Sequence, residues 1–114
     1  MKIALSSEGN LLEDNLDMRF GRAKGFIIYD LDNNEYEYID NDQNVNAVQG
    51  AGIQSAQCVV DKGAEAVITG YCGPKAYKVL EAAEVKIYTS DKDSIANTIK
   101  KFKNDELSEQ EKDI

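Results

Sequence analysis

The segment Gly70-Tyr71-Cys72-Gly73-Pro74-Lys75 has the residue types best suited to chemistry in this sequence. It lies between a predicted strand and a predicted helix, where backbone N–H groups and a partial positive dipole would surround the thiol of Cys72. A cysteine at a helix N-terminus tends toward the thiolate, the form that binds soft metals and iron–sulfur clusters. The segment therefore predicts a metal-binding thiol. The alternative is that Cys72 is a small buried residue in a tight Gly-Pro turn.

A second candidate is the loop Asp17-Met18-Arg19-Phe20-Gly21-Arg22-Ala23, which places two arginines in an otherwise acidic region. The glycine between the arginines permits unusual backbone angles, so both guanidinium groups could converge on an anion. The alternative is that the arginines form surface ion pairs with the six acids of residues 30–42 while Phe20 fills the core.

The remaining residue types exclude much familiar chemistry. The chain has no histidine, so Ser-His and Cys-His nucleophiles, histidine-ligated zinc and histidine general bases are absent. Its two cysteines have no zinc or redox spacing, and reduced thiols are expected. Cys58 falls among polar residues of its predicted helix and is interpreted as an incidental exposed thiol. Gly50-Ala51-Gly52 lacks the third glycine of a dinucleotide fingerprint and is a weak nucleotide motif.

Length and charge narrow the classes of partner. The chain has 114 residues and a formal charge of −8, from 13 Lys+Arg and 21 Asp+Glu, which fits one domain. Because an acidic chain without a basic cluster repels phosphate groups, neither nucleic acids nor anionic membranes are expected partners. The first ten residues have too few apolar positions for a signal peptide, and no stretch approaches a membrane-spanning length. A cytoplasmic location is expected.

The candidate residues must be positioned by a small set of strands. Segments 25–31 and 35–41 flank the Asx-rich turn Asp32-Asn33-Asn34 and predict a β-hairpin. Short apolar runs rich in β-branched residues predict three further strands, at 2–7, 66–70 and 85–89.

Three helices are predicted between and after these strands. The first spans about 51 to 62, and the second starts at Gly73-Pro74, with proline in its first turn. The third follows Ser90, whose S-x-x-D spacing with Asp93 predicts a capping motif. Two apolar stripes at helical spacing support the outer helices: Ile53, Ala56, Val60 and Ala64, and Ile95, Ile99 and Phe102.

The expected fold is α/β, with a five-stranded mixed sheet in the order 3-2-1-4-5, counted along the chain. Only the second strand runs antiparallel to the rest. In this topology loops 8–22, 41–52, 70–74 and 89–91 converge at one end of the sheet, where α/β proteins bind ligands. The domain is expected to span residues 1–102, and the acidic segment 103–114 is expected to be a frayed tail.

The order of these elements, with D-M-R-F-G-R-A after the first strand and V-I-T-G-Y-C-G-P-K-A at the fourth, resembles the dinitrogenase iron–molybdenum cofactor biosynthesis family over roughly residues 1–102. The resemblance implies a ribonuclease-H-like fold and a non-catalytic carrier of an iron–sulfur or iron–molybdenum type metallocluster. Cluster donor and acceptor proteins would be its partners. The positions that match the family pattern are Phe20, Gly21, Arg22, Ala23, Gly70, Gly73 and Pro74.

A metallocluster carrier in cluster assembly or transfer is the leading hypothesis. Cys72 would be the metal ligand, Arg19 and Arg22 would complement a negative cluster, and amides around Gly73 would support it. The alternative is a metal-free module that binds a small anion or a partner protein. A small enzyme is not expected, because no residue beyond Cys72 could act as a nucleophile with support. Nuclease activity is not expected either, since the first strand, Lys2 to Ser7, has no acid for the two-metal chemistry of ribonuclease H.

Overall fold

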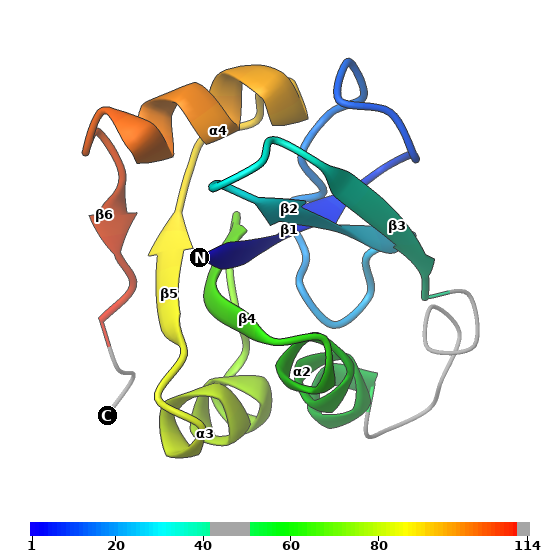
Figure 1. The fold of residues 1–114 in the computed structure, drawn as a ribbon. Coiled ribbons are helices and arrows are strands. Elements are labelled where there is room, and N and C mark those ends of the chain that lie inside the picture. The colour runs from blue at the N-terminus through cyan, green and yellow to red at the C-terminus, as the bar shows by residue number, and fades with distance from the viewer. Residues whose placement is uncertain (42–50, 112–114) are drawn as a thin grey trace.

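The computed structural model describes residues 1–41 and 51–111, which form one mixed sheet with helices on both faces (Figure 1). The strands are β1 (Lys2–Ser7), β2 (Gly25–Asp30), β3 (Tyr36–Asp40), β4 (Ala64–Thr69), β5 (Lys86–Thr89) and β6 (Ser108–Glu109). The helices of the described residues are α2 (Ala51–Asp61), α3 (Pro74–Ala82) and α4 (Ile95–Lys103). No helix in this part of the chain is long and apolar enough to cross a bilayer.

The sheet has the order β3-β2-β1-β4-β5-β6. β1 pairs antiparallel with β2 and parallel with β4, and β4 and β5 are also parallel. The mixed sheet, the order of the first five strands and the three helices are confirmed. Much of the loop expected at 41–52 lies in residues 42–50, outside the described residues. The ribonuclease-H-like fold stays a prediction.

The sheet separates two hydrophobic clusters because successive side chains of a strand point to opposite faces. Ile3 and Leu5 of β1 pack toward α4, in a cluster that includes Ile95 and Ile99. Ala4 packs toward α2 and α3. Figure 1 shows α2 and α3 together below the sheet and α4 above it. The central strands are thus buried on both faces, which explains their almost continuous apolar sequence.

The five-strand count is wrong because β6 forms within the segment expected to fray. Residues 108 and 109 pair antiparallel with β5, and Gln110 N donates to Ile87 O at 2.7 Å. Leu107 packs against the cluster on the α4 side. A strand this short is held by backbone hydrogen bonds to the edge of β5, so it needs no apolar pattern that the sequence could reveal. The frayed tail is therefore a wrong expectation for residues 103–110.

The predicted start of the third helix is also wrong, by four residues. Ser94 is the N-cap of α4, and its Oγ accepts a hydrogen bond from Asn97 N at 3.1 Å. Asp93 instead accepts from Ser94 N and forms an ion pair with Lys101. The apolar stripe of Ile95 and Ile99 is confirmed, since both side chains are buried.

The buried face of α2 differs from the predicted one. Ile53 is 42% exposed, whereas the buried residues are Ala51, Ser55, Ala56 and Val59. The face turns because Ser55 is buried with its hydroxyl hydrogen-bonded to Gly21 O and Asn41 Oδ1, both at 3.3 Å. A hydrophobic pattern cannot show a polar residue that becomes buried through hydrogen bonds.

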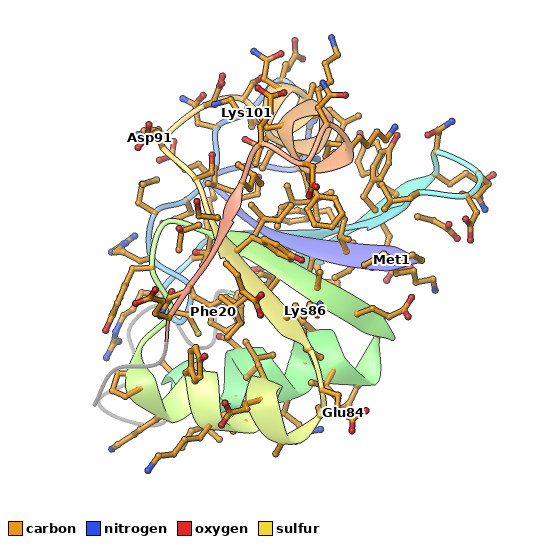
Figure 2. The ribbon with its side chains drawn as sticks, turned by 90° about the vertical axis from the view of Figure 1, so that its left-hand side faces the viewer. Met1, Phe20, Glu84, Lys86, Asp91 and Lys101 are labelled. Atoms are coloured by element: carbon orange, nitrogen blue, oxygen red, sulfur yellow. The ribbon has the colours of Figure 1, made fainter. Side chains whose placement is uncertain are left out.

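The carboxyl ends of β4 and β5 define one end of the molecule. In Figure 2, Phe20 and Asp91 lie toward that end, while Met1 and Glu84 lie toward the opposite end. The loops that follow β1 and β4 therefore leave the sheet on the side expected for a ligand site.

Candidate functional site

The two segments that carry the candidate residues lie side by side. Phe20 N donates to Tyr71 O at 3.2 Å, and Arg19 and Tyr71 form a parallel β-bridge. This contact follows from the parallel pairing of β1 with β4, which sends both following segments to the same end of the sheet. The prediction that loops 8–22 and 70–74 lie within reach of one another is confirmed.

Two glycines permit this close approach. A Cβ at Gly70 would lie 2.6 Å from Met18 O and 2.7 Å from Met18 Cα. A Cβ at Gly21 would lie 2.8 Å from Gly52 Cα, in the first turn of α2. The arginine loop thus fills the space between the end of β4 and the start of α2, and any side chain at these positions would push it out.

Buried polar groups hold the same loop in place. Ser6 Oγ donates to Asp17 O at 2.6 Å, and the Asp17 carboxylate accepts from Arg19 N at 3.0 Å. On the other side of the loop, Asn41 Nδ2 donates to Ala23 O at 3.0 Å. The loop backbone is therefore preorganised by hydrogen bonds at both ends.

The two arginines extend from this fixed backbone. The side chain of Arg19 is 66% exposed, with its Nε 3.5 Å from Asp17 Oδ1, a long and solvated ion pair. Arg22 is half-buried and has an interaction partner. Arg19 therefore pairs within its own loop, and the guanidinium group remains accessible to an anion.

The start of α3 adds backbone donors beside the arginine loop. Gly73 is the N-cap, Pro74 occupies the first turn, and no side chain among residues 1–41 and 51–111 caps the helix. A Cβ at Gly73 would have nothing within 4 Å, and the φ of −65° suits any residue. Neither packing nor backbone angle therefore requires glycine here, and the helix N-terminus is open to close approach.

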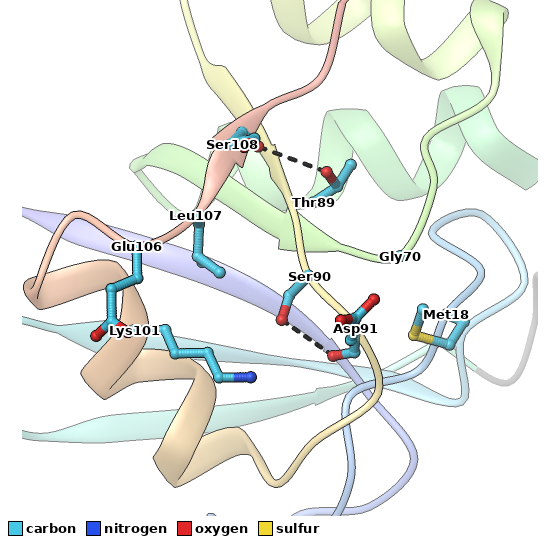
Figure 3. A pocket seen from close by; sticks show the side chains of 9 residues that line it. All are labelled: Met18, Gly70, Thr89, Ser90, Asp91, Lys101, Glu106, Leu107 and Ser108. Carbon is cyan, nitrogen blue, oxygen red and sulfur yellow. Dashed lines mark hydrogen bonds between the residues drawn. The ribbon is translucent and has the colours of Figure 1, made fainter.

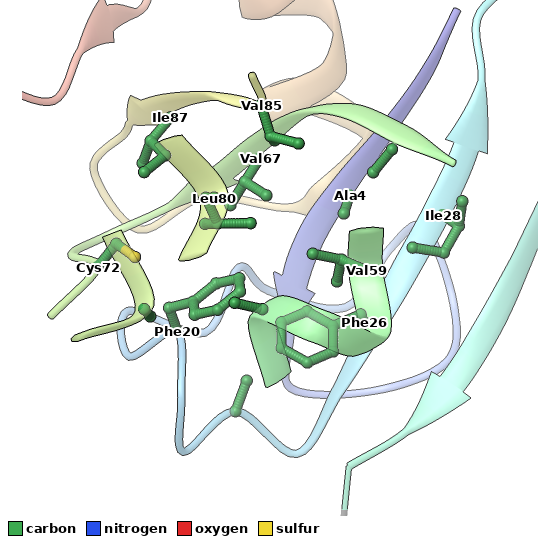
Figure 4. Close-up of a cluster of buried hydrophobic side chains, with 14 residues drawn as sticks. Ala4, Phe20, Phe26, Ile28, Val59, Val67, Cys72, Leu80, Val85 and Ile87 are labelled. Atoms are coloured by element: carbon green, nitrogen blue, oxygen red, sulfur yellow. The ribbon is translucent and has the colours of Figure 1, made fainter. Parts of the chain in front are cut away.

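Cys72 lies in the core instead of facing this surface. Its side chain is fully buried between Phe20 and the residues of α3 and β5 (Figure 4). Burial raises the pKa of the thiol to about 12, so the thiolate character expected from the nearby helix N-terminus is wrong. Desolvation exceeds the effect of the helix dipole, and the thiol stays protonated. Its role as a metal ligand stays a prediction.

Phe20 has the core role that one interpretation of the sequence gave it. It is 1% exposed, and its ring centroid lies 5.1 Å from that of Phe26. Cys58 is half-buried, not fully exposed, and burial raises the pKa of its thiol. Within the residues that the structure describes, no three His, Cys, Asp or Glu side chains are grouped to hold a metal ion.

A pocket of about 410 Å³ opens beside the arginine loop, between β5, α4 and β6 (Figure 3). Met18 and Gly70 form its border with the loop, and Lys101 contributes a cation that is already paired with Asp93. Asp91 and Glu106 also line it. These carboxylates make the pocket a poor place for an anionic ligand, so we do not assign one to it.

Three residues near the site, Met18, Tyr71 and Gln110, were not predicted from the sequence to take part in it. Met18 is 37% exposed and Tyr71 is 50% exposed, which places apolar surface next to Arg19. Gln110 bonds with its side-chain amide to Cys72 N at 2.9 Å and Cys72 O at 2.8 Å. An exposed methionine or tyrosine is recognisable only in the folded structure, and Gln110 lies 38 residues from its partner.

Comparison with known proteins finds one matching family model and a related archaeal protein. The family model described as dinitrogenase iron–molybdenum cofactor matches residues 1–105. An uncharacterized protein of Methanocaldococcus jannaschii is 35% identical over 105 residues, which is 90% of this chain and 85% of that protein.

Two solved structures share the fold closely. The apo form of the orange protein from Desulfovibrio gigas superposes with a TM-score of 0.92 at 34% identity, covering 96% of this chain and 92% of that chain. A NifB-type protein of the DUF35 family from Thermotoga superposes with a TM-score of 0.85 at 32% identity, covering 95% and 91% of the two chains.

Proposed function

This chain belongs to the dinitrogenase iron–molybdenum cofactor family, and from that premise we propose that it carries an iron–sulfur or iron–molybdenum type metallocluster during cluster assembly or transfer. Its family and structural neighbours indicate a small cluster-associated carrier or accessory protein. The cluster is the cargo, received from a donor protein and handed to an acceptor protein. The name of the orange protein, together with its description as an apo form, supports a coloured and removable ligand in that relative.

The main support for the proposal is that the arginine loop, residues 17–23, lies next to the uncapped start of α3. Phe20 N and Tyr71 O join the two segments, so Arg19 lies against the stretch that leads to Gly73. Metal–sulfide clusters are anionic, and guanidinium groups and uncapped helix amides are donors that anions prefer. The site can thus attract an anion locally although the whole chain has a formal charge of −8.

The apolar groups around the arginines suit the same cargo. Met18 and Tyr71 expose a thioether and a ring beside Arg19. Polarizable side chains make favourable contacts with soft sulfur surfaces, while the open setting leaves one side of the cargo accessible. An open site is what transfer to another protein requires, and two cysteines in the chain are too few for the four thiolates that usually enclose an iron–sulfur cluster.

Direct ligation by Cys72 is the finer form of the proposal. It requires the thiol to turn out of the core and to lose a proton whose pKa burial raises to about 12. Cys72→Ser tests it, with Cys58→Ser as the matched control. Loss of bound iron only in Cys72→Ser would support the ligand role. Equal iron in both variants would show that charge and backbone groups hold the cargo without a thiolate bond.

Anaerobic reconstitution tests the carrier function itself. The full chain is incubated with ferrous iron, sulfide and molybdate, desalted, and analysed for metal content and visible absorption. We expect a coloured protein. We expect Arg22→Gln, at a half-buried position, to weaken cargo binding by about tenfold or more, since a sheltered charge-assisted hydrogen bond contributes about 1.5 to 3 kcal/mol. Arg19→Gln should weaken binding by about fivefold or less, because this side chain is 66% exposed and water screens its charge. Lys86→Gln, which removes a charge at the amino end of β5, is the control and should bind as the wild type does.

A metal-free anion-binding or protein-interaction module is the second candidate. The burial of Cys72 favours it, as does the lack of a grouped ligand set among the residues described. If the reconstituted wild type retains no iron or molybdenum, the carrier function is wrong and the metal-free module becomes the better explanation. Titration with phosphate and sulfate, followed by NMR at the amides of residues 17–23 and 70–75, would then show whether the same loops bind a simple anion.

A further inference from the structure

The side-chain amide of Gln110 is bonded at both its polar atoms to one residue of the cargo site. Cys72 N donates to Gln110 Oε1 at 2.9 Å, and Gln110 Nε2 donates to Cys72 O at 2.8 Å. A primary amide offers the same donor and acceptor as a peptide group, so Gln110 acts like a strand neighbour for the loop after β4. The loop thereby gains sheet-like pairing where the sheet itself has ended.

Gln110 is itself held from two directions. Its backbone N–H donates to Ile87 O at 2.7 Å, which continues the pairing of β6 with β5. Its carbonyl oxygen lies 3.5 Å from the hydroxyl of Tyr77 on α3, which donates to it. The backbone of Gln110 is therefore hydrogen-bonded both to the edge of the sheet and to α3, the helix whose N-terminus forms part of the site. This fixes the position from which its side chain bonds to Cys72.

These bonds determine which groups the loop presents to a ligand. Tyr71 O is taken by Phe20 N, and both polar backbone groups of Cys72 are taken by Gln110. The donors next in the chain are at Gly73 and in the first turn of α3, where no side chain of residues 1–41 and 51–111 provides a cap. The peptide that precedes these donors is fixed in orientation by Gln110.

We propose that Gln110 is a positioning residue of the cargo site, which orients the Cys72 peptide so that the amides at the start of α3 face the cargo beside Arg19. This inference rests on the proposed function. Gln110 does not touch the cargo in this arrangement, and its effect on binding passes through Cys72 and Gly73. Cargo affinity should therefore depend on the hydrogen-bonding state of a side chain at the far edge of the sheet.

Gln110→Glu tests the proposal because it makes the two hydrogen bonds between residue 110 and Cys72 depend on pH. The ionised carboxylate can accept from Cys72 N but has no proton for Cys72 O, whereas the protonated carboxyl group can make both bonds. Among the described residues, the groups that face or flank position 110 are the Tyr77 hydroxyl, the Cys72 peptide, Glu109 and Glu111. Burial raises the pKa of the Cys72 thiol to about 12, so this thiol is neutral near pH 7. The two acidic neighbours disfavour a further negative charge, so they raise the pKa of the introduced carboxyl above its usual value of about 4.3.

Two readouts are compared at each pH. Amide hydrogen exchange by NMR, corrected for the intrinsic rate, reports the state of the Cys72 peptide without any cargo. Reconstitution with ferrous iron, sulfide and molybdate at pH 7.5 reports binding. At pH 7.5 the second carboxylate oxygen faces Cys72 O with no proton between them, and this repulsion displaces the side chain and weakens the bond to Cys72 N as well. We therefore expect Gln110→Glu to lose about tenfold in Cys72 amide protection and about tenfold in bound metal at pH 7.5. Wild-type protection should return as the carboxyl group is protonated toward pH 4.

Ser108→Glu is the matched control, because it adds the same charge to the same strand without touching Cys72. It should leave both readouts unchanged, and circular dichroism should show that every variant is folded. If Gln110→Glu exposes the Cys72 amide but binds metal as the wild type does, Gln110 is only a structural brace and the inference fails alone. If the wild type binds no metal, the proposed function is wrong, and the positioning role of Gln110 is wrong as well. The hydrogen-exchange data would still show whether Gln110 protects the Cys72 amide.

Discussion

Three glycines of the candidate site differ in the reason for their presence. Gly21 and Gly70 are required by packing, since a Cβ at either would lie under 3 Å from backbone atoms of Gly52 or Met18. Gly73 has free space around it and an ordinary backbone angle. Gly73 is thus required by neither packing nor backbone angle; glycine is a favoured residue at an N-cap, and its lack of a side chain leaves the start of α3 open.

Alanine substitution separates these roles. Gly70→Ala should lower the free energy of unfolding by about 1 to 3 kcal/mol, because the new methyl group forces Met18 to move. Gly73→Ala should change stability by about 0.5 kcal/mol or less, because the gain from a less flexible unfolded chain offsets the lower preference for alanine at an N-cap. Urea unfolding followed by circular dichroism measures both. A loss of stability in Gly73→Ala similar to that of Gly70→Ala would contradict this assignment.

The two thiols should differ in reactivity. Iodoacetamide at pH 8 should modify Cys58 readily and Cys72 only on unfolding, because Cys72 is fully buried and its thiol pKa is raised to about 12. The measurement is mass spectrometry of Cys58→Ser and Cys72→Ser, each of which retains one thiol. Rapid modification of the Cys58→Ser variant in its folded state would show that the loop after β4 opens far more than this structure indicates.

At the scale of elements, α4 shows how its cap sets its position. Ser94 caps the first turn, and Asp93 pairs with Lys101 two turns later. The loop after β1 docks onto the same helix start, since Ile95 N donates to Asp14 O and Ala96 N to Leu12 O, both at 2.8 Å. α4 therefore joins the cargo-side loop to the sheet, and its cap contributes to the order of both.

Substitution of the two candidate capping serines tests this arrangement. Ser94→Ala should destabilise the protein by about 1 kcal/mol, because Asn97 N loses its acceptor. Ser90→Ala, at the position that the S-x-x-D spacing favoured, should have little effect, since this hydroxyl donates to the carbonyl of the neighbouring Asp91 and caps no helix. Thermal unfolding of both variants checks the prediction, and the reverse order of effects would contradict it.

Strands and helices with strong apolar periodicity were predicted correctly from the sequence. The prediction was wrong where a single polar contact determines the start of a helix or the presence of a strand. The hairpin 25–41 and the strands at 2–7 and 66–70 followed from alternating or continuous apolar residues. The cap at Ser94 was missed because Ser90 offered an equally plausible spacing. β6 was missed because two polar residues pair through their backbone alone. The side to which Cys72 points was equally hidden, since a tight turn fixes the position of a residue but not its direction.

At the scale of the whole molecule, the two hydrophobic clusters share the same strands. Alternate residues of β1, β2 and β4 line opposite faces, so neither cluster can lose its strands without exposing the other. The molecule is therefore expected to unfold as one unit, although its helices lie on opposite faces of the sheet (Figure 1).

Leucine truncation tests this coupling. Leu80→Ala, on α3, should cost about 2 to 5 kcal/mol, because the side chain is fully buried. Leu11→Ala should cost about 0.5 kcal/mol or less, because that side chain is 45% exposed. Circular dichroism and tyrosine fluorescence should give one coincident transition in the wild type and in Leu80→Ala. Separate transitions from the two probes would show that the clusters unfold independently.

The outer edge of β3 has a consequence for behaviour at high concentration. Within residues 1–41 and 51–111, the sheet order leaves one side of this strand without a neighbour, and a strand in that position can template the addition of a second chain. β3 is short, it follows Glu35 and ends at Asp40, and Glu37 within it forms an ion pair with Lys62. Two copies brought edge to edge would set these carboxylates against each other. The charge of the hairpin is therefore expected to disfavour edge-to-edge association, and the short length of β6 is expected to limit it at the opposite edge.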